Sequence, residues 1–90
     1  MDIEQDLIER CRRKDRKAEN ELYKILFSFL MSVCRRYICQ DEKAREILNI
    51  GFSRLLLNID KYRPIAPFQY WARTIMVNVL INENRKERLH

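Results

Sequence analysis

Basic and aromatic side chains alternate near the middle of the chain and again in its last third. Aromatic rings can stack on unpaired nucleobases while arginine and lysine neutralise phosphates, so the pattern is typical of a surface that binds a nucleic-acid strand. Helical spacing places Tyr37 and Trp71 on apolar faces and predicts that both lie in the core. Tyr62, Ile65 and Tyr70 are less easily placed in a core.

A polar pattern lies close to the C-terminal end. Asn78, Asn82 and Arg85 are spaced by four and three residues, so they share one face of a helix. Asparagine can bond a base edge, and arginine can bond a guanine or a phosphate. The same face could equally be an ordinary solvated surface, so the pattern alone leaves both interpretations open.

The residue types needed for catalysis are scarce. The sequence has no glycine-rich phosphate loop, and its one histidine is His90. Cys11, Cys34 and Cys39 show no C-x-x-C spacing, which excludes a zinc site of the usual kind and predicts reduced thiols, with Cys34 in the core. We therefore expect no enzymatic activity, no metal and no cofactor.

The charge balance favours a polyanionic partner, and the absence of targeting signals in the sequence predicts a cytoplasmic location. The 18 Lys and Arg residues outnumber the 13 Asp and Glu residues, which gives a formal net charge of +5. This balance suits nucleic acid, although it also promotes solubility. The N-terminus is acidic where a signal peptide is basic, and no apolar stretch is long enough to span a membrane.

The periodicity of apolar residues predicts four helices around one core, that is, a single all-α bundle over residues 1–90. Asp41 is the expected N-cap of the third helix. Gly51 lies within that helix, either to allow the close approach of another backbone or as a tolerated weakness. The predicted helices cover residues 2–13, 17–38, 41–59 and 68–87, and a proline-containing loop covers residues 60–66.

The third helix carries a second polar surface away from its apolar stripe. Arg45, Glu46, Asn49, Ser53 and Arg54 lie on it, and Ile50 interrupts it. We expect Ile50 to be exposed there. An exposed isoleucine in polar surroundings can mark a protein contact, although single exposed hydrophobic residues are common.

Two motifs resemble those of a known family. Residues 44–52, AREILNIGF, resemble the helix that typically reads AEDLVQEVF in bacterial RNA polymerase sigma factors. Residues 67–78, PFQYWARTIMVN, resemble the F-x-x-W-(L/I)-x-R-I-x-x-N stretch of the same family. Further matches, in order and with family spacing, are Leu7-Ile8, Asp15, Ala18, Leu22-Tyr23 and Arg85-Lys86. The chain looks most like region two of the extracytoplasmic-function subgroup.

The resemblance implies a transcription initiation domain that binds core RNA polymerase and recognises the promoter minus-ten element in single-stranded form. The third helix would dock on the clamp helices of the β′ subunit, the next loop would capture a flipped base of the non-template strand, and the last helix would contact the melted strand. The implied polymerase-binding residues are Arg45, Glu46, Asn49, Ile50 and Ser53. The implied DNA-binding residues are Tyr62, Arg63, Pro64, Ile65 and Ala66 in the loop, and Arg73, Asn78, Asn82, Arg85 and Lys86 on the last helix.

The sequence departs from the family pattern at three of these positions. Arg45 and Ile50 stand where acidic residues are usual, and Asn82 stands where aspartate is frequent. A typical member also continues into a second helical domain that reads the minus-thirty-five element. The chain is then either a fragment of a two-domain protein or a single-domain variant, and we expect the fragment.

Two other hypotheses stay open. The departures at Arg45, Ile50 and Asn82 motivate a sigma-like interaction module that binds polymerase or an anti-sigma factor without sequence-specific DNA readout. A helix-turn-helix module that binds duplex DNA is disfavoured, because the loop at residues 60–66 is too long and too rich in proline for a tight turn.

Overall fold

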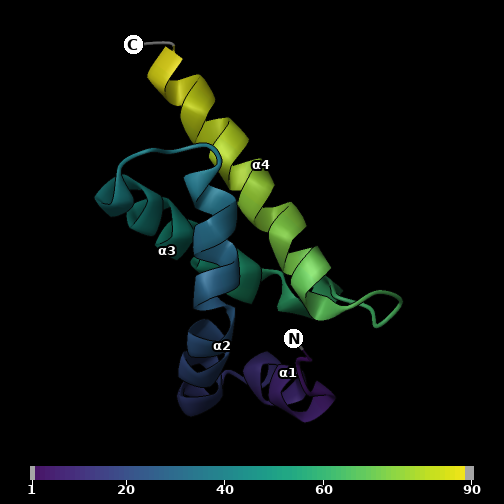
Figure 1. Ribbon diagram of the computed structural model, residues 1–90. Coiled ribbons are helices and arrows are strands. Elements are labelled where there is room, and N and C mark those ends of the chain that lie inside the picture. Colours follow the sequence, from purple (N-terminus) through teal and green to yellow (C-terminus); the bar gives the residue numbers. More distant parts are fainter. Residues whose placement is uncertain (1, 89–90) are drawn as a thin grey trace.

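Helices make up almost all of the secondary structure in the computed structural model, which describes residues 2–88 (Figure 1). The described part is all-α, and the predicted fold class is confirmed. In Figure 1, α4 runs diagonally across α2 and α3, and α1 lies beside the lower end of α2. The elements are α1 (Gln5–Arg12), α2 (Arg16–Arg35), α3 (Asp41–Leu57), the short 3₁₀ turn η1 (Ile59–Lys61) and α4 (Phe68–Arg88).

The corner between α1 and α2 is defined by backbone geometry. Lys14 adopts a left-handed conformation with φ of 65°. The amide of Lys14 donates to the carbonyl of Cys11, and the amide of Asp15 donates to the carbonyl of Arg10. This bonding closes α1 with a Schellman motif. The Asp15 carboxylate then accepts from the amides of Lys17 and Ala18 and caps α2. The two helices are therefore joined at a fixed angle.

The core lies where α4 packs against α2 and α3. Gly51 of α3 is buried and faces Met76 of α4. A Cβ atom at Gly51 would lie only 2.5 Å from Cε and Sδ of Met76, and 3.8 Å from its Cα. Of the two interpretations of Gly51, the structure therefore supports the close approach of another helix.

Two expectations about the link between α2 and α3 were wrong. Tyr37 is 53% exposed rather than in the core, because α2 ends at Arg35 and the helical repeat no longer applies to Tyr37. Asp41 is the first residue of α3 and not its N-cap, which is Gln40. The Asp41 carboxylate instead accepts a hydrogen bond from Nε of Arg35 at 3.2 Å.

Cys11 and Cys34 are buried, whereas Cys39 is exposed. Within residues 2–88, no group of side chains could hold a metal ion and no helix is long and apolar enough to cross a membrane. Burial raises the pKa of Cys34 from 9.0 to about 11. Burial, with the charge of Glu19 as the next cause, does the same for Cys11.

The buried thiols predict a loss of stability in alkali. The folded protein holds these two protons more tightly than the unfolded chain, whose thiols titrate near 9.0. The contribution of these two thiols to the free energy of unfolding should therefore be constant below pH 9 and fall as the pH rises from 9 towards 11. Urea titrations across this range would measure it. A Cys11→Ser/Cys34→Ala variant should lose most of the pH dependence, and an unchanged slope would contradict the assignment.

Candidate nucleic-acid interface

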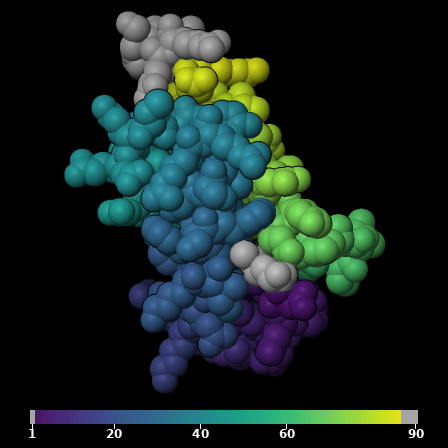
Figure 2. All heavy atoms as spheres, in the orientation of Figure 1, coloured from purple at the N-terminus to yellow at the C-terminus, as the bar shows by residue number. Residues whose placement is uncertain are grey.

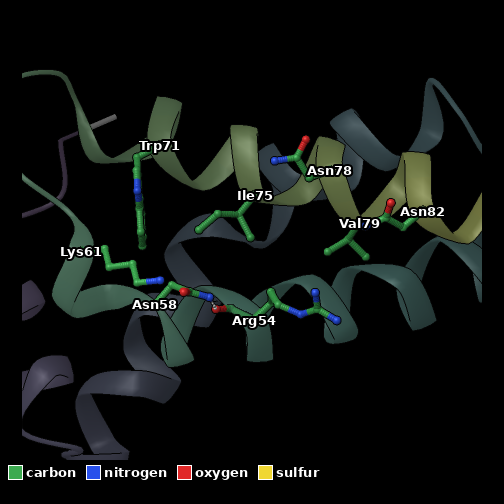
Figure 3. Close-up of a pocket in the computed structure, with 8 residues that line it drawn as sticks. All are labelled: Arg54, Asn58, Lys61, Trp71, Ile75, Asn78, Val79 and Asn82. Carbon is green, nitrogen blue, oxygen red and sulfur yellow. Dashed lines mark hydrogen bonds between the residues drawn. The ribbon is translucent and has the colours of Figure 1, made fainter.

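A groove runs between α3 and α4 and ends at the η1 turn (Figure 3). Its volume is about 310 Å³. In Figure 3 the Trp71 ring points from α4 towards the Lys61 side chain, and Arg54 extends along α3 below α4. Neither Arg54 nor Lys61 forms an ion pair within the described residues, so both charges are free. We call this the amide groove, and it is lined by Arg54, Asn58, Lys61, Trp71, Ile75, Asn78, Val79 and Asn82.

A second hollow, of about 360 Å³, lies between the loop after η1 and the start of α4. Most of its surface is apolar, as suits the face of a nucleobase. Lys61 and Trp71 line this hollow as well as the amide groove, so the two are neighbours. We call it the loop pocket, and it is lined by Lys61, Tyr62, Arg63, Ile65, Ala66, Tyr70, Trp71 and Thr74.

Tyr62 does not project freely, as a base-stacking residue would. Its side chain is buried, with 5% exposed. The ring lies 4.9 Å from the Phe68 ring and 5.5 Å from the Trp71 ring, measured between centroids. The Tyr62 hydroxyl donates to the carbonyl of Ala66 at 2.8 Å. The expectation that Tyr62 fits the core poorly was therefore wrong, because the loop folds back and lets this ring join an aromatic cluster with Phe68 and Trp71.

The rest of the loop is open to solvent. Ile65 is 93% exposed at its tip, and Arg63, Pro64 and Ala66 are exposed as well. The loop stands out from the body of the molecule in Figure 2, in green. The Nη1 group of Arg63 donates to the carbonyls of both Asp60 and Tyr62, which keeps the guanidinium close to the backbone. Four of the five predicted loop residues are thus accessible to a strand.

The predicted residues of α4 divide into separate groups. Asn78 and Asn82 lie together in the amide groove. Arg73 lines neither hollow and instead places its guanidinium 5.4 Å from the centroid of the Tyr70 ring. Arg85 and Lys86 are exposed farther along the helix, where Lys86 pairs with Glu83.

Three polar residues that the fold brings opposite Asn78 and Asn82 were not predicted to belong to this site. Asn58 and Lys61 were not singled out from the sequence, and Arg54 was assigned to the second polar surface of the third helix. Arg54, Asn58 and Lys61 come from the end of α3 and from η1, at spacings of four and three residues. That spacing was a signal for one shared face. The sequence could not show that this face turns towards α4, because the contact joins segments far apart in the chain.

The α3 residues predicted to bind polymerase are exposed with one exception. Arg45, Glu46, Asn49 and Ser53 are exposed. Ile50 is half-buried and packs against the core, so the expectation of an exposed isoleucine was wrong. The exposed aliphatic side chain on this face is Leu57, which is 77% exposed. It lies seven residues after Ile50 and four after Ser53, so it shares the outward face.

Asn49 is held in place from α2. The Tyr23 hydroxyl donates to Oδ1 of Asn49 at 2.6 Å. The Tyr23 ring also meets the Phe52 ring edge-on, with centroids 5.1 Å apart. This face of α3 is therefore tied to α2 through Tyr23.

A basic helical domain with an apolar hollow beside a groove of amides and free cations has the features expected of a helical nucleic-acid-binding module. The model of the Sigma-70 region 2 family matches residues 22–90. The chain belongs to this family, whose members are non-enzymatic transcription initiation domains that bind core RNA polymerase and promoter DNA. No curated protein matches the sequence. The matched residues include α3, the loop and α4, whereas α1 lies outside them.

Proposed function

We propose that this domain binds the non-template strand of the promoter minus-ten element in single-stranded form. One flipped base occupies the loop pocket, and the adjoining nucleotides follow the amide groove. The observation that carries the proposal is that Lys61 and Trp71 line both hollows. A strand can therefore pass from one hollow to the other without leaving the protein surface.

The loop pocket and the amide groove contribute to DNA binding through different interactions. The apolar wall of the loop pocket, which includes Ile65 and Trp71, favours the face of a base and offsets the few kcal/mol that base extraction costs. In the amide groove, Asn78 and Asn82 present donors and acceptors to base edges. Arg54 and Lys61 attract the phosphates, which adds affinity but no sequence preference.

The outward face of α3 is the proposed polymerase contact. It joins Arg45, Glu46, Asn49 and Ser53 to the exposed Leu57. This face has less negative charge than is usual in the family, and Leu57 can add an apolar contact with the clamp helices of β′. The same observation favours the second candidate function, a module that binds polymerase or an anti-sigma factor without reading DNA.

Fluorescence anisotropy with single-stranded minus-ten oligonucleotides of varied sequence tests the proposal. The full chain should prefer some sequences, and Asn78→Ala/Asn82→Ala should reduce that preference by about ten- to a hundredfold, because a good base-edge contact contributes about 1–3 kcal/mol of discrimination. Asn84→Ala is the matched control, since Asn84 is exposed on α4 but does not line the amide groove.

Two outcomes count against the proposal. Equal binding of all oligonucleotides, with affinity set by salt alone, would remove the claim of sequence preference. Loss of preference in Asn84→Ala to the same degree as in the double variant would remove the amide groove from the site. Binding to the β′ clamp helices together with the first outcome would favour the interaction module.

A further inference from the structure

Arg12 of α1 crosses to the backbone at the base of the loop. Its Nη2 donates to the carbonyl of Tyr62 at 2.7 Å, and its Nε donates to the carbonyl of Ile59 at 3.4 Å. These partners lie 50 and 47 positions away in the sequence. Nη1 of the same guanidinium pairs with the Glu9 carboxylate at 2.6 Å, which orients the planar group.

The two carbonyls occupy a point where the backbone changes course. Ile59 begins the η1 turn and Tyr62 follows it, at the position where the loop starts. Carbonyl groups at the end of a helical turn have few partners within the turn. Here the Ile59 carbonyl accepts from the Tyr62 amide at 3.2 Å and the Tyr62 carbonyl accepts from Nη1 of Arg63 at 3.0 Å, and Arg12 adds a second donor to each. Arg12 supplies charged donors, which form stronger bonds than neutral ones.

Tyr62 is therefore fixed from two sides. Its carbonyl accepts from Arg12 on α1 as well as from its neighbour Arg63, its ring packs on Phe68 and Trp71, and its hydroxyl donates to the carbonyl of Ala66. The hydroxyl bond spans most of the loop and brings Ala66 towards the start of α4. The position of the Tyr62 backbone thus determines where the walls of the loop pocket stand.

The helix that carries Arg12 is itself firmly attached. Leu7, Ile8 and Cys11 are buried, and α1 packs against both α2 and η1. The Schellman motif at Lys14 and the cap at Asp15 fix its direction. Arg12 is presented to the loop by a rigid element, and this element lies outside the matched residues 22–90.

We infer that α1 is part of the base-binding site, with Arg12 as the positioning residue that preforms the loop pocket. Arg12 acts through the backbone of Tyr62 and does not line either hollow. The inference rests on the proposed function, because it assigns Arg12 to the pocket that accepts the flipped base. It predicts that Arg12 affects base preference more than phosphate affinity.

The test compares Arg12→Met with Arg10→Met in the full chain. Both arginines lie on α1 and pair with carboxylates, Arg12 with Glu9 and Arg10 with Asp6 and Glu21, but only Arg12 bonds to the loop. Anisotropy titrations use the oligonucleotide series described above, at a temperature below the unfolding transition of every variant. Arg12→Met should lose about tenfold in preference between the best and worst oligonucleotides, as expected for one charge-assisted hydrogen bond. Arg10→Met should keep the preference.

Arg12→Lys keeps the charge but loses the planar fork. A lysine amine is a compact point charge without the forked geometry that reaches two carbonyls, so we expect part of the base preference to remain. Full retention of the preference in both Arg12→Lys and Arg12→Met would overturn the inference. The lysine variant also provides a result if the methionine variant does not fold.

A second readout needs no DNA. Trp71 is the single tryptophan of the sequence, and its ring lies 5.5 Å from the Tyr62 ring. Acrylamide should quench its fluorescence more readily in Arg12→Met than in the wild type, and equally in Arg10→Met and the wild type. If the wild type shows no base preference but this difference appears, the proposed function fails and the positioning role stands. If Arg12→Met matches Arg10→Met in both readouts, the positioning role fails.

Discussion

Tyr62→Ala should lower the free energy of unfolding by about 3–5 kcal/mol, the range for removing a large aromatic side chain from a core. The Tyr62 ring contacts both Phe68 and Trp71, and its hydroxyl ties the two ends of the loop together through Ala66. Its loss leaves a cavity under the loop and frees the carbonyl of Ala66. Urea or thermal unfolding followed by circular dichroism would measure the change.

Two other tyrosine substitutions separate the roles of Tyr62. Tyr62→Phe keeps the ring and loses only the hydrogen bond to Ala66, so we expect a loss of about 1 kcal/mol. Tyr70→Ala is the control for an exposed aromatic residue of the same pocket, and it should change stability by about 0.5 kcal/mol or less. If Tyr62→Ala were as mild as Tyr70→Ala, the aromatic cluster would not be part of the folding core.

Gly51→Val should lower the free energy of unfolding by about 1–3 kcal/mol, the usual loss when an extra group is forced into a packed core. The Cβ atom alone would lie 2.5 Å from the end of the Met76 side chain, which is itself fully buried. Valine adds two further methyl groups at this contact. The intrinsic gain in helix propensity over glycine is under about 1 kcal/mol, so the steric loss decides the sign.

A double-mutant cycle assigns this loss to Met76. Met76→Ala opens space opposite Gly51, so Gly51→Val should be less destabilising in that background, with a coupling energy of about 0.5–3 kcal/mol. Ser53→Val, at an exposed position of the same helix, controls for the substitution itself and should be close to neutral. Additive effects of Gly51→Val and Met76→Ala would contradict the contact as the cause.

The amino-acid sequence by itself determined the helical elements and their order. Apolar spacing is a local property, so the predicted helix at residues 17–38 and the observed α2 (Arg16–Arg35) differ mainly at the C-terminal end. Pro64 and Pro67 marked the one long loop for the same local reason. The motifs around Phe52 and Trp71 indicated the family, since each motif lies within one short stretch of the sequence.

The tertiary structure decided which side chains form the site. Tyr37 was expected in the core and is exposed, whereas Tyr62 was expected outside the core and is buried. Burial depends on which distant segments pack against a residue and not on its neighbours in sequence. Arg54, Lys61 and Asn78 line one groove only because α3 packs on α4. Arg12 reached Tyr62 across 50 positions, and no local pattern encodes such a contact. The sequence therefore determined the helices and the family, whereas contacts between distant segments determined the pocket, the groove and the helix that supports them.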